Sequence, residues 1–301
     1  MSNRVAIRAF LTSGGRVLRE GDRIALQGEA PPALAQALCA TILPVPDPAA
    51  TLGVRELLRA RAGRLYAIRS EAEAREAVAV LAAAPVLGFD VETEVNPEWR
   101  GPVEVRFTKA GDPAKRQPRG TAFALDPLRS KPRLVQLFAR PADGCFVFDM
   151  RAVPWSVLAP VLTSSKLIAV NAIFDLKRVL QAGIVPRAAG DPLRLAALTH
   201  GLVRGVSLAS LAKLVLRFDV PKEFARSDWG ADTLSRAQWE YAALDAVLAL
   251  DLYRELMIRL SDDERQVACL VEANLVPAAR MELAGVPFDA AAHARMVSGW
   301  K

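Results

Sequence analysis

Short apolar runs of strand length alternate with longer helical segments from residue 66 onward, and this alternation restricts the chain to few folds. We expect strands at 86–91, 134–139, 145–148 and 167–170. We expect helices at 71–84, 155–162, 172–181, 192–200, 208–216 and 235–260. A sheet whose strands alternate with helices is covered by those helices, so the pattern predicts an α/β fold.

The first 65 residues show a different pattern. Residues 5–11 and 16–27 alternate in the manner of strands, with Gly14-Gly15 and Gly21-Asp22 as turn signals. Helices are expected at 32–42 and 54–62. We therefore expect residues 1–65 to form a small N-terminal α+β appendage, whose role the sequence does not indicate.

Positive charge is concentrated in one segment of the 301-residue chain. Lys and Arg exceed Asp and Glu by 39 − 33 = 6, and residues 99–133 alone hold nine basic and three acidic residues, also a difference of 6. Five prolines in this segment predict a long surface loop. Two interpretations stay open, namely a solvated insertion and an electrostatic arm that binds nucleic acid. The basic residues are Arg100, Arg106, Lys109, Lys115, Arg116, Arg119, Arg129, Lys131 and Arg133.

Cysteine and histidine are scarce, which limits the chemistry. Two histidines and three widely spaced cysteines argue against a histidine-rich zinc site and a Ser-His-Asp triad. Any metal should be held by carboxylates, which favours Mg²⁺ or Mn²⁺. An odd number of cysteines suits a reducing compartment. No apolar run approaches the ~18–20 residues of a membrane span, and no secretory signal is recognisable, so we expect a cytoplasmic protein without a membrane partner.

Asp90 and Glu92 flank Val91 at the expected end of the first strand of the α/β region. Residues i and i+2 of a strand point to the same face, so the two carboxylates should converge. They are expected at the carboxyl end of the strand, where open α/β sheets place ligands. The repulsion between two neighbouring carboxylates is relieved by a cation.

Two helices add further candidates. Asn171 and Asp175 are four residues apart near the start of one helix, so they share a face. Asn171 is equally interpreted as an N-cap. Ser235 and Gln238 fit a capping box that fixes the register of the long helix.

That register places Tyr241 and Asp245 on one helix face. These motifs together look like the DEDD superfamily of 3′–5′ exonucleases, in its tyrosine-bearing branch (DEDDy). The matching segments are Phe89-Asp90-Val-Glu92-Thr93, Asn171-Ala-Ile-Phe174-Asp175-Leu and Tyr241-Ala-Ala-Leu-Asp245.

The block Arg226-Ser-Asp228-Trp229, followed by Leu234 and Gln238, is similar to ribonuclease D-like sequences. The resemblance covers residues 66–262 and implies a ribonuclease H-like fold, with a mixed central sheet flanked by helices.

The resemblance also implies roles for individual residues. Asp90, Glu92 and Asp245 would hold one divalent cation, Mg²⁺ or Mn²⁺, and Asp175 with Asp90 would hold a second. Tyr241 would orient the attacking water. Candidate substrate-binding residues are Asn171, Arg226 and Thr93.

A second resemblance begins where the first ends. The segment Asn274-Leu-Val-Pro277-Ala-Ala-Arg280-Met281-Glu282-Leu-Ala-Gly285-Val-Pro-Phe-Asp289 looks like the part of family A, polymerase I-type DNA polymerases that joins the exonuclease to the thumb. We expect residues 263–301 to be the helical start of such a segment, with Gly285 just after a helix end. A polymerase domain or partner is then implied.

The leading hypothesis is a metal-dependent 3′–5′ exonuclease that acts on single-stranded or frayed DNA, with a role in proofreading or repair, and releases nucleoside 5′-monophosphates. One alternative is trimming of RNA 3′ ends, as in ribonuclease D. The other is a catalytically silent module that binds nucleic acid.

Overall fold

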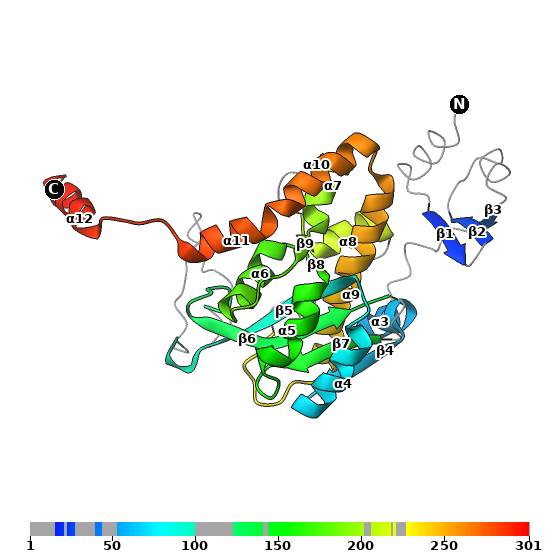
Figure 1. Cartoon of the computed structure of the whole chain (residues 1–301), viewed down its shortest axis with the longest axis horizontal. Coiled ribbons are helices and arrows are strands. Elements are labelled where there is room, and N and C mark those ends of the chain that lie inside the picture. The colour runs from blue at the N-terminus through cyan, green and yellow to red at the C-terminus, as the bar shows by residue number, and fades with distance from the viewer. Residues whose placement is uncertain are drawn as a thin grey trace.

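The computed structural model (Figure 1) describes residues 16–20, 23–27, 40–43, 53–99, 123–140, 144–201, 206–217, 219–220 and 227–300. The strands in these ranges form two sheets. A three-stranded sheet has the order β1-β2-β3, and a six-stranded sheet has the order β4-β7-β6-β5-β8-β9.

The six-stranded sheet is mixed. β5 pairs antiparallel with β6 and β6 pairs antiparallel with β7, whereas β4–β7, β5–β8 and β8–β9 are parallel pairs. This arrangement agrees with the ribonuclease H-like fold that the motifs imply. The strands are β4 (Arg64–Ile68), β5 (Val86–Val95), β6 (Ser130–Phe138), β7 (Gly144–Asp149), β8 (Lys166–Ile168) and β9 (Ala188–Gly190).

Helices cover both faces of this sheet. Leu134 and Phe138 of β6 pack in one apolar core with α3, α7, α8 and α9, whereas Val135 and Leu137 pack in a second core with α4, α5, α6 and α11. Alternate residues of one strand thus reach opposite faces. The helices are α3 (Val54–Ala62), α4 (Glu71–Leu81), α5 (Trp155–Ser164), α6 (Ala172–Gln181), α7 (Pro192–His200), α8 (Leu208–Leu216), α9 (Arg236–Arg259), α10 (Asp262–Ala273), α11 (Leu275–Ala284) and α12 (Ala290–Gly299).

The strands differ from the sequence prediction in three main respects. β5 continues four residues beyond Val91, so Asp90 and Glu92 lie within the strand and not at its end. β6 begins at Ser130, so the last four residues of the expected loop 99–133 are strand. β9 was not predicted, because its three residues, Ala-Ala-Gly, carry no strand pattern.

The N-terminal strands are β1 (Arg16–Glu20), β2 (Arg23–Gln27) and β3 (Ala40–Leu43). β1 and β2 form the antiparallel pair that the Gly21-Asp22 turn predicts. The helix expected at 32–42 is wrong at its end, where β3 pairs with β2. The strand expected at 5–11 lies outside the described residues. The domain division after residue 65 stays a prediction, although α3 and β4 pack with the six-stranded sheet.

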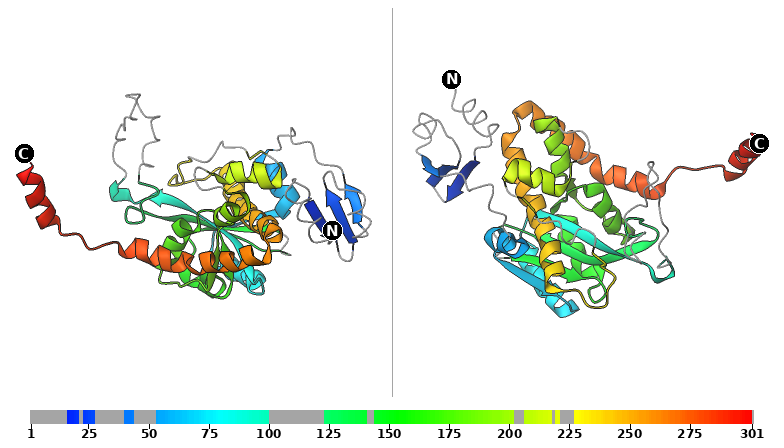
Figure 2. Two further views of the ribbon diagram at one scale, coloured as in Figure 1. Left: turned by 90° about the horizontal axis from the view of Figure 1, so that it is seen from above. Right: turned by 180° about the vertical axis from the view of Figure 1, so that it is seen from behind.

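The C-terminal helices follow the body of the fold. Gly285 has a φ of +68° directly after α11, so it ends that helix as expected. Figure 2 shows α12 apart from the sheet, and none of its residues is buried. Within the described ranges, no helix has both the length and the apolar character needed to cross a bilayer.

Candidate active site

β5 carries Asp90 and Glu92 on the face of the sheet that α9 covers. Leu87, Phe89 and Val91 point to the opposite face, where they belong to the core formed with α4, α5 and α6. The alternation along the strand therefore turns the two intervening carboxylates toward α9. The sequence prediction that both acids share a face is consistent with this arrangement.

Gly88 allows α9 to lie unusually close to β5. A Cβ atom added to Gly88 would lie 2.2 Å from the carbonyl oxygen of Ala246 and 3.0 Å from Cβ of Leu250. No side chain fits in that space, so glycine is required for the contact. Asp245 precedes Ala246, and the close approach brings its carboxylate over β5.

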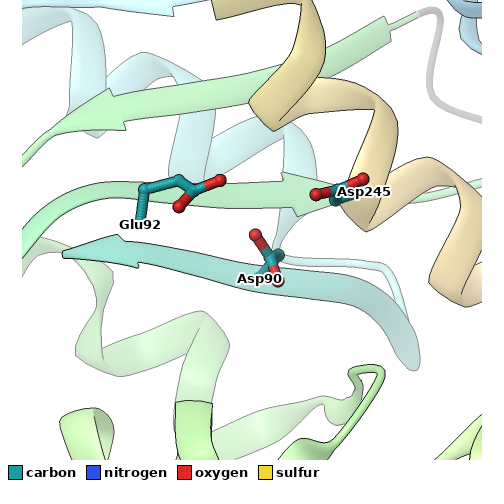
Figure 3. A group of neighbouring side chains, drawn as sticks. All are labelled: Asp90, Glu92 and Asp245. Carbon is teal, nitrogen blue, oxygen red and sulfur yellow. The ribbon is translucent and has the colours of Figure 1, made fainter. Parts of the chain in front are cut away.

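The carboxylates of Asp90, Glu92 and Asp245 gather into one cluster (Figure 3). One oxygen from each of the three lies within 4.8 Å of the other two. Two of the acids come from a strand and the third from a helix more than 150 residues later in the chain. The fold thus brings together three of the four acids that the sequence motifs selected.

Asp175 lies beside this cluster on α6. Its side chain is buried, and its Oδ1 accepts a hydrogen bond from the backbone N–H of Val91, at 3.1 Å. That N–H lies between Asp90 and Glu92 in the chain, so the bond ties α6 to the strand that carries them. Burial, followed by the negative charge of Asp90, raises the pKa of Asp175.

Tyr241 lies one turn before Asp245 on α9, and its side chain is buried. The start of α9 is fixed by the expected capping box, in which Ser235 and Gln238 each bond the other's backbone N–H. Burial raises the pKa of the Tyr241 phenol, and the charges of Asp245, Glu92 and Asp90 raise it further. The phenol is therefore protonated at neutral pH and acts as a hydrogen-bond donor.

Burial and mutual repulsion both disfavour the ionised form of these carboxylates. Loss of solvent raises the pKa of Asp90 to about 7. The pKa of Glu92 is raised well above its usual range by burial, and then by the charges of Asp90, Asp245 and Asp175. Burial, followed by the charge of Asp90, raises the pKa of Asp245 in the same way. Charged neighbours of one sign favour the neutral form unless a cation compensates them.

The cluster has the donors that a hard divalent cation requires. All its ligand atoms are carboxylate oxygens, which suit Mg²⁺ or Mn²⁺ better than zinc. Oδ1 of Asp245 is buried and has no hydrogen-bond partner among the described side chains and backbone. A buried oxygen of this kind is satisfied by a bound cation, so the residues fit the metal that the motifs imply.

Asn171 precedes α6 but does not cap it with its side chain. It adopts a left-handed conformation, with a φ of 62°, and its side chain is exposed. Asp191 instead accepts hydrogen bonds from the backbone N–H groups of Asn171 and Ala172, at 3.2 and 3.3 Å. The sequence analysis overlooked Asp191, whose position directly before Pro192 is a helix-start signal.

The other two expected substrate-binding residues are Thr93 and Arg226. Thr93 is buried, and its hydroxyl donates to the carbonyl oxygen of Ala124 at 2.6 Å, so it fastens the segment that precedes β6. Arg226 lies outside the described residues. A role in substrate binding stays a prediction for both.

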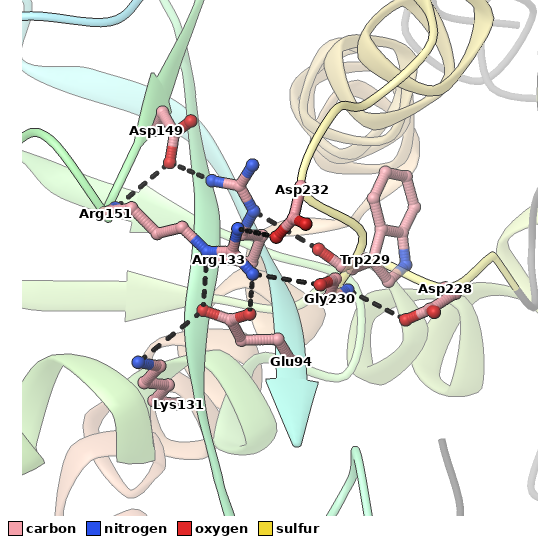
Figure 4. A network of polar contacts seen from close by, with 9 residues as sticks. All are labelled: Glu94, Lys131, Arg133, Asp149, Arg151, Asp228, Trp229, Gly230 and Asp232. Atoms are coloured by element: carbon pink, nitrogen blue, oxygen red, sulfur yellow. Dashed lines mark hydrogen bonds and ion pairs between the residues drawn. The ribbon is translucent and has the colours of Figure 1, made fainter. Parts of the chain in front are cut away.

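A second polar network borders the cluster along β5 (Figure 4). Arg151 donates from Nε and one Nη to the carboxylate of Glu94, whose side chain is 2% exposed. The same guanidinium donates to the carbonyl oxygen of Gly230 at 2.9 Å. The network thus holds the loop that leads into α9 against the edge of β5.

Arg133 belongs to the same network and corrects part of the loop prediction. The pairing of β5 with β6 shifts after Glu92, which leaves Arg133 as an extra residue in β6. Its side chain is buried, bonds Asp149, and donates to the carbonyl oxygen of Trp229 at 3.2 Å. Arg133 is therefore a structural residue and not part of a solvated loop.

Two other basic residues from the expected loop also have partners within the fold. Arg129 lies over the rings of Trp99 and Phe123, and Lys131 is 3.7 Å from Glu94. The remaining six basic residues fall in 100–122, outside the described part of the chain. The choice between a passive insertion and an arm for nucleic acid therefore stays open for them.

Comparisons with known proteins agree with this geometry. Residues 124–261 match a family model described as 3′–5′ exonuclease. DNA polymerase I of Aquifex aeolicus is 28% identical over 177 residues, which cover 52% of this chain and 30% of that protein. Ribonuclease D of Pseudomonas paraeruginosa is 32% identical over 114 residues, 37% of this chain and 30% of that protein. The chain thus spans about a third of the length of these two relatives.

Solved structures share the fold. RNase D of Escherichia coli, described as an exoribonuclease involved in structured RNA processing, superposes with a TM-score of 0.55 at 21% identity. The match covers 74% of this chain and 52% of that one. NrnC of Brucella melitensis bound to pGG gives a TM-score of 0.53 at 21% identity, covering 73% of this chain and 92% of that one.

Proposed function

We propose that this chain removes nucleotides from the 3′ ends of nucleic acids, because residues 124–261 match a 3′–5′ exonuclease family model and the chain is similar to DNA polymerase I and ribonuclease D. The reaction is hydrolysis of the terminal phosphodiester, which releases a nucleoside 5′-monophosphate. The single observation that carries the proposal is the convergence of Asp90, Glu92 and Asp245 within 4.8 Å.

Hydrolysis of a phosphodiester is slow because the phosphate repels an incoming anion and the leaving alkoxide is basic. Divalent cations bound at such a cluster supply charge neutralisation and lower the pKa of water. Asp90, Glu92 and Asp245 would hold one cation, Mg²⁺ or Mn²⁺, and Asp90 would share a second with Asp175. The hydrogen bond from the Val91 N–H supports this proposal, because it ties Asp175 to the strand that carries Asp90 and Glu92.

Tyr241 acts as a positioning group for water in this proposal. Its raised pKa keeps the phenol protonated, so it donates a hydrogen bond and does not remove a proton. One helical turn separates it from Asp245 on α9, and this spacing supports a role for the hydroxyl at the carboxylate cluster. Asn171, whose side chain is exposed at the start of α6, is a candidate to contact the terminal nucleotide.

Single-stranded or frayed DNA is the first substrate we propose. The similarity to DNA polymerase I supports it. RNA is the second candidate, supported by the 32% identity to ribonuclease D. The resemblance of residues 274–289 to the segment that joins exonuclease and thumb in polymerase I-type DNA polymerases supports a polymerase region or partner.

Matched DNA and RNA oligonucleotides test the proposal. Each strand is labelled at its 5′ or its 3′ end and incubated with the full chain, with Mg²⁺, Mn²⁺ or EDTA. Removal from the 3′ end gives a ladder from the 5′-labelled strand and a single labelled mononucleotide from the 3′-labelled strand. The ratio of the DNA and RNA rates decides between the two substrates.

Asp90→Asn serves as the inactive variant and Asp263→Asn as its matched control, since Asp263 is an exposed acid on α10. Hydrolysis should require the metal and disappear in Asp90→Asn alone. A folded chain that binds the strands but cleaves neither with Mn²⁺ would support the silent-module alternative. Equal cleavage by the chain and Asp90→Asn would refute the assignment of the cluster.

A further inference from the structure

A basic cavity lies on the other side of α9 from the carboxylate cluster. Its volume is about 520 Å³, within the range of small-molecule sites. It is formed by α3, β4 and the first turn of α9. Its main polar lining residues are Arg55, Arg59, Arg64, Arg69, Arg236 and Glu240.

The cavity lining carries five arginines and one glutamate, a formal charge of 5 − 1 = +4. Glu240 is buried, and among the described residues its carboxylate bonds only to Nε of Arg55 and Nε of Arg236, at 2.9 Å each. The paired Nη groups of both guanidiniums have no hydrogen-bond partner within the described ranges. Glu240 therefore orients two guanidinium forks without occupying the Nη pairs that bind phosphate oxygens in parallel.

Trp239 supplies an independent sign of a ligand. Its side chain is 4% exposed and lines the cavity, yet the indole Nε1 has no acceptor in the described structure. A buried donor without an acceptor is uncommon in a folded protein. Arg69 lies over the same ring, 4.9 Å from its centroid. Arg59, exposed near the end of α3, has no ion pair with a described carboxylate.

Helical geometry separates this cavity from the catalytic face. At 100° per residue, Tyr241 and Asp245 lie about 40° apart around α9, whereas Trp239 lies about 160° from Tyr241. Arg236 and Glu240 share the far side with Trp239. Within the described structure, α9 thus contributes Asp245 to the carboxylate cluster on one side and Arg236 to the cavity on the other.

We propose that this cavity is a second binding site for a nucleotide phosphate, distinct from the carboxylate cluster. The guanidinium groups of Arg55 and Arg236, together with those of Arg59 and Arg69, bind the phosphate oxygens. The indole N–H of Trp239 donates to another oxygen of the nucleotide. A volume of about 520 Å³ exceeds what a bare inorganic anion fills, which favours a nucleotide. The choice of a nucleic acid over another polyanion rests on the proposed function.

Binding of a fluorescently labelled single-stranded 20-mer to the full chain tests this site. Anisotropy is recorded in EDTA, so that hydrolysis does not interfere, between about 50 and 200 mM salt. The double variant Arg59→Gln/Arg69→Gln should weaken binding ~10-fold at low salt. It should also reduce the slope of log affinity against log salt by about 1.4, at ~0.7 per phosphate contact.

The matched control removes two exposed arginines outside the cavity, in Arg75→Gln/Arg254→Gln, and should leave the slope unchanged. Circular dichroism checks that both variants are folded. Trp239→Phe keeps an aromatic ring but removes the N–H, and should weaken binding about threefold with no change in slope. Affinities and slopes that stay unaltered in the cavity variants would overturn the proposal.

Calorimetric titration with a nucleoside 5′-monophosphate identifies the source of the phosphate. If the unaltered chain gives a heat of binding and Arg59→Gln/Arg69→Gln does not, the cavity binds free nucleotide, such as the product. No heat, together with weakened 20-mer binding, assigns it to the strand. These measurements do not need cleavage, so a chain that binds at the cavity but hydrolyses nothing would refute the proposed function and leave this inference standing.

Discussion

Asp90, Glu92, Asp175 and Asp245 are brought close together against their own repulsion. Burial raises the pKa of each, and the charge of a neighbouring acid raises the pKa of Glu92, Asp175 and Asp245 further. Acids that are placed where ionisation is unfavourable destabilise the folded chain, but they favour the binding of a cation. The same four acids that would bind a metal therefore lower the stability of the metal-free chain.

Replacing one of these acids should therefore stabilise the chain while it removes activity. We expect Asp90→Asn to raise the melting temperature in EDTA by a few degrees, because it removes one of four repelling charges without changing side-chain size. Thermal denaturation followed by circular dichroism measures the change, and Asp263→Asn provides the control. A lower melting temperature for Asp90→Asn would show that the acid supports the fold.

The raised pKa of Asp90 also predicts a pH dependence. Its pKa is about 7 in the folded chain, against a usual value of 3.8, so the folded state holds more protons between these two values. The free energy of unfolding in EDTA should then fall as the pH rises from about 4 to about 7. Melting temperatures across this range should fall less steeply in Asp90→Asn. Equal slopes would contradict the raised pKa.

Tyr241→Phe should reduce the rate of hydrolysis without abolishing it. The phenol positions water by donating a hydrogen bond, whereas the carboxylates supply the ligands, so its loss leaves the cluster intact. We expect kcat to fall ~10²-fold, with KM little changed. Steady-state kinetics on a single-stranded oligonucleotide measures both constants. A kcat equal to that of the unaltered chain would remove Tyr241 from the mechanism.

The helices of this fold were easier to predict than its strands. The bounds of α3, α6, α7 and α8 agree with the sequence prediction, since local signals such as Pro192 at the start of α7 and Gly201 after its end mark helix ends. β5 and β6 were predicted too short because Glu94 and Arg133 do not fit an apolar strand. Their partners come from distant segments, which no local pattern reveals.

The same distinction holds for the site. The pleat of β5 and the register of α9 predicted which acids share a face, and the cluster is consistent with both. The packing of α9 against Gly88 could not be predicted, because it depends on the absence of a side chain at one position. Glycine in a strand carries no sign of which element approaches it.

Gly88→Ala tests this contact between β5 and α9. The added methyl group would lie 2.2 Å from the carbonyl oxygen of Ala246, so the helix must move. We expect a loss of roughly 1–3 kcal/mol in the free energy of unfolding and a lower affinity for Mn²⁺. Urea denaturation measures the first change and calorimetric titration with Mn²⁺ the second. Ala79→Gly, at an exposed position of α4, is the control. Gly183→Ala is unsuitable because Gly183 has a positive φ. An unchanged Mn²⁺ affinity would show that the contact at Gly88 does not position the carboxylate cluster.

At the scale of the whole molecule, Arg151 and Arg133 connect the sheet to the loop that leads into α9. Both guanidiniums bond backbone carbonyl oxygens of that loop, at Gly230 and Trp229. The helix with Tyr241 and Asp245 is therefore anchored at the segment that precedes it as well as at Gly88. The positions of the catalytic candidates depend on contacts that span the chain.

Arg151→Gln should loosen this anchor. Glu94 would stay buried and would keep Lys131, at 3.7 Å, as an ion-pair partner. Because Arg151 is about one-third exposed, we expect a loss of about 1–3 kcal/mol, below the range for fully buried pairs. Urea denaturation measures it, and the double variant Glu94→Gln/Arg151→Gln should recover part of the loss. No recovery in the double variant would show that the carbonyl contact of Arg151 matters more than its ion pair.

The carboxylates that face one another across the gap between β5 and α9 have a mechanical consequence. An ion bridging them would join two layers of the fold as a covalent cross-link does, and its binding energy would add to resistance against unfolding. Chelators would then act on this chain as mild denaturants. Its tolerance of heat would rise and fall with the supply of divalent ions in its surroundings.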